Sequence, residues 1–109
     1  MKKFLAAVSA LNDESRVQIL AFLAQHKSCC VCELEASLGM IQSTLSRHLR
    51  ILKDAGFLEV TRQGARSYYD IEPKSQMHAN LLSEVKSLNL KLPAKIFAEN
   101  TTRYQILGK

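Results

Sequence analysis

Residues 37–64 read SLGMIQSTLSRHLRILKDAGFLEVTRQG, and most of the expected architecture follows from them. Gly39 is a favourable C-cap for a helix that begins near the cysteines at 29–32. The segment 40–55 then carries an apolar stripe at helical spacing and stops at Gly56. Two helices joined by a short glycine-containing turn are typical of a helix-turn-helix. The stripe consists of Ile41, Leu45, Leu49 and Leu52.

The pattern changes from helical to strand-like after Gly56. Two short apolar runs, Leu58 with Val60 and Tyr69 with Ile71, flank a turn at residues 63–65 that contains a glycine. This arrangement predicts a β-hairpin. A basic hairpin directly after a helix-turn-helix corresponds to a wing. The predicted fold class is therefore mainly α with a small β-hairpin, a winged helix-turn-helix.

The flanking segments predict three more helices. Residues 4–11 carry one apolar stripe, a helix capped by Asn12 or Asp13 runs to about Gln25, and a last long helix spans about residues 74–88. A chain of 109 residues is expected to form one domain. We assign residues 1–92 to that domain and residues 93–109 to a C-terminal extension with a short helical turn and a loosely ordered end.

The overall charge favours a polyanionic partner. The chain has 15 Lys and Arg against 10 Asp and Glu, a net charge of +5 and a pI near 9.3, which suits nucleic acid. No run approaches the roughly 18 apolar residues that would cross a bilayer. The basic, apolar start is interrupted by polar residues too early for a signal peptide. We expect a cytoplasmic protein that does not contact a membrane.

The outward face of the second helix and the hairpin tip form the predicted DNA-contacting surface. Residues 40–66 contain five basic and two acidic residues, a bias that favours DNA contact over a merely solvated helix face. The first residues of the helix are expected to read bases, and the later basic residues to touch phosphate. Arg47 is expected to make contacts of both kinds. His48 is expected to support DNA contact or packing, and the hairpin residues to reach the backbone or minor groove. The predicted set is Gln42, Ser43, Thr44, Ser46, Arg47, His48, Arg50, Lys53, Arg62, Gln63 and Arg66.

The three cysteines of the chain, Cys29, Cys30 and Cys32, lie within four residues. An odd number at this spacing does not build a disulfide framework, and it indicates a soft-metal or redox site. In a helical first turn Cys29 and Cys32 would share a face, whereas Cys30 and Cys32 would not. Gathering all three sulfurs around one ion would therefore distort the start of the helix and reposition the DNA-contacting helix packed against it.

Three segments resemble the ArsR/SmtB family of bacterial metal-sensing repressors. Residues 10–20 (ALNDESRVQIL) resemble the opening of the family domain, residues 46–58 (SRHLRILKDAGFL) its recognition helix, and residues 62–69 (RQGARSYY) its wing. The likeness covers roughly residues 4–90. It implies a homodimer formed through the first and last long helices, and repression that an inducer relieves.

The cysteines also resemble a family motif. Residues 30–34 (CVCEL) resemble the Cys-Val-Cys-Asp-Leu box of the family, but the third Cys of arsenic-sensing members is replaced here by Glu35. As(III) and Sb(III) prefer three soft thiolates, and Cys29 could supply the missing one. We therefore expect As(III) or Sb(III) as inducer, bound by Cys29, Cys30 and Cys32.

Other inducers stay open at this point. Thiol redox or persulfide sensing fits a cysteine at a helix N-terminus. A Cd, Pb or Zn sensor would need a fourth ligand, for which His26 is the nearby candidate. Trivalent organoarsenicals, which need two thiolates, would fit Cys30 and Cys32. A second metal site of zinc-sensing relatives, on the last helix, is expected to be absent because His78 and Glu84 lack a second histidine.

We expect no enzymatic activity. No phosphate-binding glycine loop, zinc-protease motif or nucleophile elbow occurs in the sequence. Ser46 and His48 are two residues apart on a helix and so point apart. A winged helix used only for protein interaction would be expected to carry a neutral or acidic face, and this face is basic.

Overall fold

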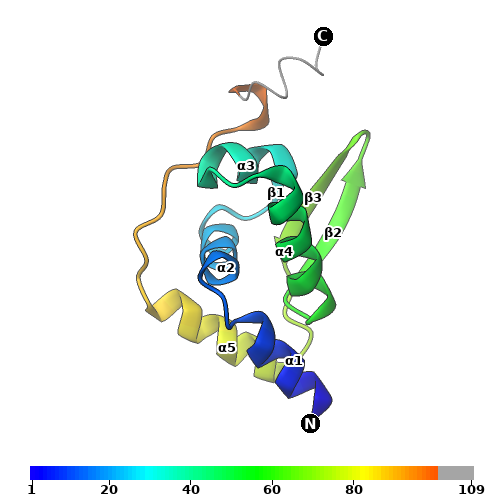
Figure 1. Cartoon of the computed structure of the whole chain (residues 1–109), viewed down its shortest axis with the longest axis vertical. Coiled ribbons are helices and arrows are strands. Elements are labelled where there is room, and N and C mark those ends of the chain that lie inside the picture. The colour runs from blue at the N-terminus through cyan, green and yellow to red at the C-terminus, as the bar shows by residue number, and fades with distance from the viewer. Residues whose placement is uncertain (101–109) are drawn as a thin grey trace.

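The computed structural model describes residues 1–100 and confirms a winged helix-turn-helix (Figure 1). Five α-helices accompany a small antiparallel sheet in this part of the chain. The short helical turn expected after residue 93 is η1, and the expected loosely ordered end lies outside the described residues. The elements are α1 (Lys2–Ala10), α2 (Glu14–His26), β1 (Cys29–Cys30), α3 (Val31–Leu38), α4 (Gln42–Asp54), β2 (Leu58–Gln63), β3 (Arg66–Ile71), α5 (Gln76–Ser87) and η1 (Ala98–Asn100).

Local capping signals placed two helix ends correctly. The Asp13 carboxylate accepts a hydrogen bond from the backbone N–H of Arg16 at 3.1 Å, so Asp13 is the N-cap of α2. That bond, the largest contribution, holds the pKa of the Asp13 carboxyl below its usual range. α3 ends at Gly39 in the left-handed conformation, φ +67°. The turn between α3 and α4 is therefore short, as the sequence predicted.

The sheet contains one strand that the sequence analysis missed. β2 and β3 form the predicted hairpin, in which Gln63 pairs with Arg66 across the turn. The two-residue strand β1 pairs with the other edge of β3, with Cys30 opposite Tyr68. A strand this short has no alternation of its own, and it exists only because β3 offers a partner about forty residues later. The helix predicted to begin near the cysteines is confirmed, since α3 begins at Val31 with Cys30 as its N-cap and contains Cys32. Cys29 and Cys30, however, form a strand ahead of α3 and are not part of its first turn.

The core lies between α2 and the helix-turn-helix. Ile19, Leu20, Phe22 and Leu23 of α2 are fully buried, as are the leucines of the α4 stripe. Ile41, predicted to belong to that stripe, is 74% exposed. It is the N-cap of α4 with an extended backbone, so its side chain does not follow the helical stripe. Within residues 1–100 no helix is long and apolar enough to span a membrane.

His78 of α5 is a structural residue that closes the junction after α4. Its Nε2 donates to the carbonyl of Ala55 at 2.8 Å, and its Nδ1 lies 2.8 Å from the Ser75 hydroxyl. The ring packs over Gly56, whose φ of +100° suits glycine. A Cβ at this position would lie 2.6 Å from His78 Nε2.

Replacing Gly56 with alanine therefore introduces both an unfavourable φ and a steric clash. We expect Gly56→Ala to lower the free energy of unfolding by about 3 kcal/mol, measured by urea denaturation. Gly64→Ala is the matched control, because Gly64 also has positive φ but has open space around it; its cost should be only about 1 kcal/mol. Equal losses in the two variants would contradict the role of His78.

Candidate DNA interface and thiol site

The predicted DNA-contacting residues lie along α4 and the adjoining hairpin. α4 and β2 pack side by side, and Figure 1 shows them at one edge of the molecule. The side chains at the start and along the outer face of α4 are exposed or partly exposed, and so are those at the hairpin tip. The exposed members are Gln42, Ser43, Arg47, Arg50, Lys53, Arg62 and Gln63, and the partly exposed members are Thr44, Ser46 and Arg66.

The structure corrects one member of this set. His48 is 6% exposed, with its Nδ1 3.3 Å from Arg16 Nη1 of α2. Burial, the largest contribution, lowers the pKa of the ring. His48 therefore packs inside and joins α4 to α2 instead of facing DNA. Its spacing of three residues from Leu45 and four from Leu52 places it on the buried stripe, a signal that the sequence analysis underused.

The cysteines are arranged differently from the predicted helical turn. The Sγ atoms of Cys30 and Cys32 lie 2.8 Å apart, and the two residues are 1% and 9% exposed. Cys30 is the N-cap of α3, so its side chain turns back over the first turn, where Cys32 lies. The prediction that Cys29 and Cys32 share a face, and that Cys30 and Cys32 do not, is wrong.

Cys29 belongs to the other side of the sheet. Adjacent residues of a strand point to opposite faces, and Cys29 packs into the main core while Cys30 packs with Cys32 and Tyr68. The Cys29 thiol donates to the carbonyl of Lys27 at 3.4 Å. Within residues 1–100, no three His, Cys, Asp or Glu side chains are gathered closely enough to hold a metal ion.

Burial keeps two of these thiols protonated. Desolvation raises the pKa of Cys29 to about 11. Desolvation, followed by the hydrogen bond with Cys32, raises the pKa of Cys30 to about 12. A thiol reacts with electrophiles and oxidants as the thiolate, and here the thiolate is disfavoured.

His26, considered as a fourth metal ligand, lies with its ring 4.4 Å from that of Phe22.

Glu33 is a site residue that the sequence analysis did not identify. Its buried side chain accepts a hydrogen bond from the backbone N–H of Cys30 at 3.1 Å, forming a capping box at the start of α3. An acidic residue three positions after an N-cap is the sequence signal for this motif. The signal was missed because cysteine is an unusual N-cap. The thiol pair is therefore attached on one side to α3 and on the other to the wing strand β3.

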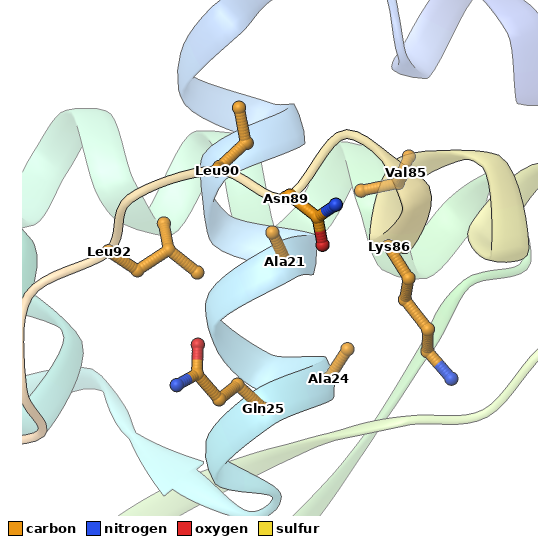
Figure 2. A pocket seen from close by; sticks show the side chains of 8 residues that line it. All are labelled: Ala21, Ala24, Gln25, Val85, Lys86, Asn89, Leu90 and Leu92. Carbon is orange, nitrogen blue, oxygen red and sulfur yellow. The ribbon is translucent and has the colours of Figure 1, made fainter.

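A surface pocket of about 330 Å³ lies elsewhere, between α2 and the chain that follows α5. Figure 2 shows Leu90 and Leu92 on that chain opposite Ala21 and Gln25 of α2. No thiol, carboxylate or imidazole lines this pocket, so it offers no chemistry for a soft ion. The lining consists of Ala21, Ala24, Gln25, Val85, Lys86, Asn89, Leu90 and Leu92.

A winged helix-turn-helix with an exposed basic face defines the class of DNA-binding transcriptional regulators. The family described as "Bacterial regulatory protein, arsR family" matches residues 13–60. The arsenical resistance operon repressor of Bacillus subtilis is 38% identical over 71 residues, which are 65% of this chain and 68% of that protein. The arsenic resistance transcriptional regulator ArsR2 of Pseudomonas putida is 33% identical over 96 residues, 86% of this chain and 79% of that protein. The chain belongs to the ArsR family.

Solved structures of similar proteins agree on the fold. Reduced HlyU from Vibrio cholerae has a TM-score of 0.70 at 26% identity, covering 83% of this chain and 92% of that one. A homodimeric winged helix-turn-helix DNA-binding domain from Mycobacterium bovis has a TM-score of 0.69 at 32% identity, covering 81% and 79%. The antimony-specific repressor AntR has a TM-score of 0.64 at 26% identity, covering 78% and 75%. This protein is thus a DNA-binding transcriptional repressor of a family that is not enzymatic.

Proposed function

We propose that this repressor leaves its operator when trivalent arsenic or antimony binds the thiols of Cys30 and Cys32, with Cys29 as the third ligand. The observation that carries the proposal is the 2.8 Å separation of the Cys30 and Cys32 sulfurs in a buried site. The names of similar proteins, arsenical resistance repressors and an antimony-specific repressor, support this inducer class.

The burial of the thiols favours a metalloid hydroxide over a divalent cation. When a trivalent arsenic hydroxide meets two thiols, each thiol proton leaves with one hydroxide as water, and the product is neutral. Cadmium, lead or zinc would instead require both thiol protons to be released to solvent, and the raised thiol pKa values disfavour that release. The raised pKa values of Cys29 and Cys30 also slow thiol oxidation, which begins from the thiolate. This environment therefore favours the arsenic and antimony interpretation over the two alternatives.

Binding of Cys29 as the third ligand would couple inducer binding to DNA affinity. Cys29 faces away from the pair, so its sulfur reaches the same ion only if β1 separates from β3. That movement would shift the N-terminus of α3, which packs on α4, and release one edge of the wing strand. Allosteric couplings of about 1–3 kcal/mol are typical, and about 1.4 kcal/mol changes affinity tenfold.

The DNA-contacting surface proposed from the sequence keeps its exposed members. Gln42, Ser43 and Thr44 would read base edges at the N-terminus of α4, while Arg50 and Lys53 would touch phosphate. The hairpin residues would lie against the backbone or minor groove. Ser46 and Arg47 complete the helix surface, and Arg62, Gln63 and Arg66 complete the wing.

Arg47→Ala tests this surface. We expect operator affinity to fall about ten- to a hundredfold at physiological salt, since a specific arginine contact is worth about 1–3 kcal/mol. Fluorescence anisotropy with DNA from the protein's own promoter measures it. Lys91→Ala, which removes an exposed cation from the chain after α5, is the control and should leave affinity unchanged. Equal affinity of Arg47→Ala and the native protein would contradict the assignment.

Cys32→Ser tests the inducer site. This variant should bind the operator as tightly as the native chain but stay bound when arsenite is added, because one sulfur of the pair is lost. In the native complex, near-stoichiometric arsenite should lower the anisotropy, and excess dithiol should restore it. Release by peroxide or persulfide with no response to arsenite would replace the proposal with a redox sensor.

Cys29→Ala separates the third thiol from the pair. Phenylarsine oxide offers two exchangeable positions on arsenic, whereas arsenite offers three. The variant should therefore keep its response to phenylarsine oxide and respond more weakly to arsenite. If both arsenicals release the variant as they release the native protein, Cys29 is not a ligand.

We further propose a homodimer formed through α1 and α5. Phe4, Leu5 and Val8 present an exposed apolar stripe on α1, and residues of α1 and α5 line a common hollow at the same end of the molecule. A similar solved structure is described as homodimeric. Such a stripe on a basic, globular domain is suited to burial against a second copy.

Leu5→Asp should dissociate the dimer, because it would bury an unpaired carboxylate in the apolar interface. Sedimentation velocity at micromolar concentration should show a dimer for the native chain and a monomer for Leu5→Asp. Lys2→Asp adds the same side chain at an exposed position of the same helix and should remain dimeric. A monomeric native chain would contradict this interface.

A further inference from the structure

The chain that follows α5 returns to the thiol site. In Figure 1 it runs along the side of the molecule from α5 back to α3. The backbone N–H of Ile96 donates to the Ser37 hydroxyl of α3 at 2.8 Å, and Lys95 Nζ donates to the carbonyl of Ser28 at 2.9 Å. Residues 95–98, called the strap below, are thus attached to both ends of the segment that holds the cysteines.

One carboxylate fastens the strap next to the thiols. Glu33 Oε2 accepts a hydrogen bond from the backbone N–H of Ala98 at 2.9 Å, and Oε1 lies 3.7 Å from Lys95 Nζ. The side chains of this ion pair are only 12% and 6% exposed, so solvent screens it little. The same Oε1 accepts from the N–H of Cys30. Glu33 therefore binds the strap and the N-cap of α3 at once.

The strap covers the sulfur pair. Ala98 is 5% exposed and packs in one apolar cluster with Cys30 and Cys32, against Tyr68 of the wing. The aromatic ring of Phe97 lies 4.9 Å from Lys95 Nζ, which adds a further contact within the strap. With the strap in this position, the pair that best fits an inducer is shielded from water.

We propose that residues 95–98 are a closure over the Cys30–Cys32 pair that must lift before an inducer or any thiol reagent can reach the sulfurs. Its role in induction rests on the function proposed above, but the closure itself does not. Lifting removes Lys95 and Ala98 from Glu33, the residue that caps α3. Opening of the strap would therefore loosen the helix start that inducer binding has to move.

The closure can be tested with a reagent unrelated to arsenic. In a Cys29→Ala background only the two thiols of the pair remain, and their alkylation by N-ethylmaleimide is followed by mass spectrometry on the reduced, full-length chain. Lys95→Ala with Ser37→Ala removes three attachments of the strap, those of Lys95 to Ser28 and Glu33 and that of Ile96 to Ser37. We expect alkylation about tenfold faster than in the parent, as for the loss of a hydrogen bond to a charged group. Labelling of a buried group follows its opening equilibrium.

Two further variants make the test specific. Lys91→Ala changes an exposed lysine of the same returning chain and should not alter the alkylation rate. Ser37→Ala alone leaves the Glu33–Lys95 pair intact and should give a smaller acceleration. Equal rates in the parent and the double variant, with both bound normally to the operator, would overturn the closure.

The outcome for arsenite is read separately, in variants that retain Cys29. Faster alkylation without arsenite-induced release of DNA would support the closure and contradict the proposed inducer. Arsenite-induced release with the same time course in the native chain and in Lys95→Ala/Ser37→Ala, and no change in alkylation, would support the inducer and overturn the closure. Faster alkylation together with faster release supports both.

Discussion

Arg16 links α4, the helix proposed to contact DNA, to the rest of the domain. Its backbone N–H is capped by Asp13, its Nε donates to the carbonyl of Ala10 at 2.7 Å, and its Nη1 reaches His48 of α4. The end of α1, the start of α2 and the buried side of α4 are thus joined at one guanidinium. A buried histidine beside a permanent cation is stable as the neutral ring, which agrees with its lowered pKa. Burial of the leucines stabilises the packing of α4, and the contact between Arg16 and His48 fixes the orientation of this helix.

The thiol site lies where the wing and the helix-turn-helix meet. Cys30 is at once a strand residue paired with Tyr68 of β3 and the N-cap of α3. A change at this residue would therefore act on β3 of the wing directly and on α4 through α3, the two elements proposed to contact DNA. Because Cys29 lies apart from the pair, the proposed three-coordinate ion could bind all three sulfurs only if the sheet edge between β1 and β3 opened.

Local patterns were sufficient to predict most of the fold. The caps at Asp13 and Gly39, the stripe of α4 and the glycine hairpin each depend on residues within a few positions of one another, which is the range over which sequence periodicity is informative. β1 could not be found in this way, because it consists of two residues and is stabilised by β3. The error about which cysteines meet followed directly from that omission, since a strand and a helical turn place neighbouring side chains differently.

The exposed face of α4 was predictable for a similar reason, and its one error is informative. Arg47 and Arg50 follow helical spacing away from the leucines, whereas His48 falls among them. The sequence analysis left DNA contact and packing open for His48, and the structure shows it packed. The role of the chain after residue 92 could not be read from the sequence. The contact between Ala98 and Glu33 joins residues 65 positions apart, and no short-range sequence pattern predicts such a contact.

The compactness of the cysteine segment has a consequence for how such a regulator can diversify. The groups that would select the inducer lie within residues 28–33, at β1 and the first turn of α3, while those that would read DNA begin at residue 42. The two sets share no side chain and communicate only through packing of α3 on α4 and through β3. A substitution within residues 28–33 could therefore change which inducer the protein responds to, while the DNA sequences that it binds stay the same. Divergence of signal and of target can proceed in separate steps.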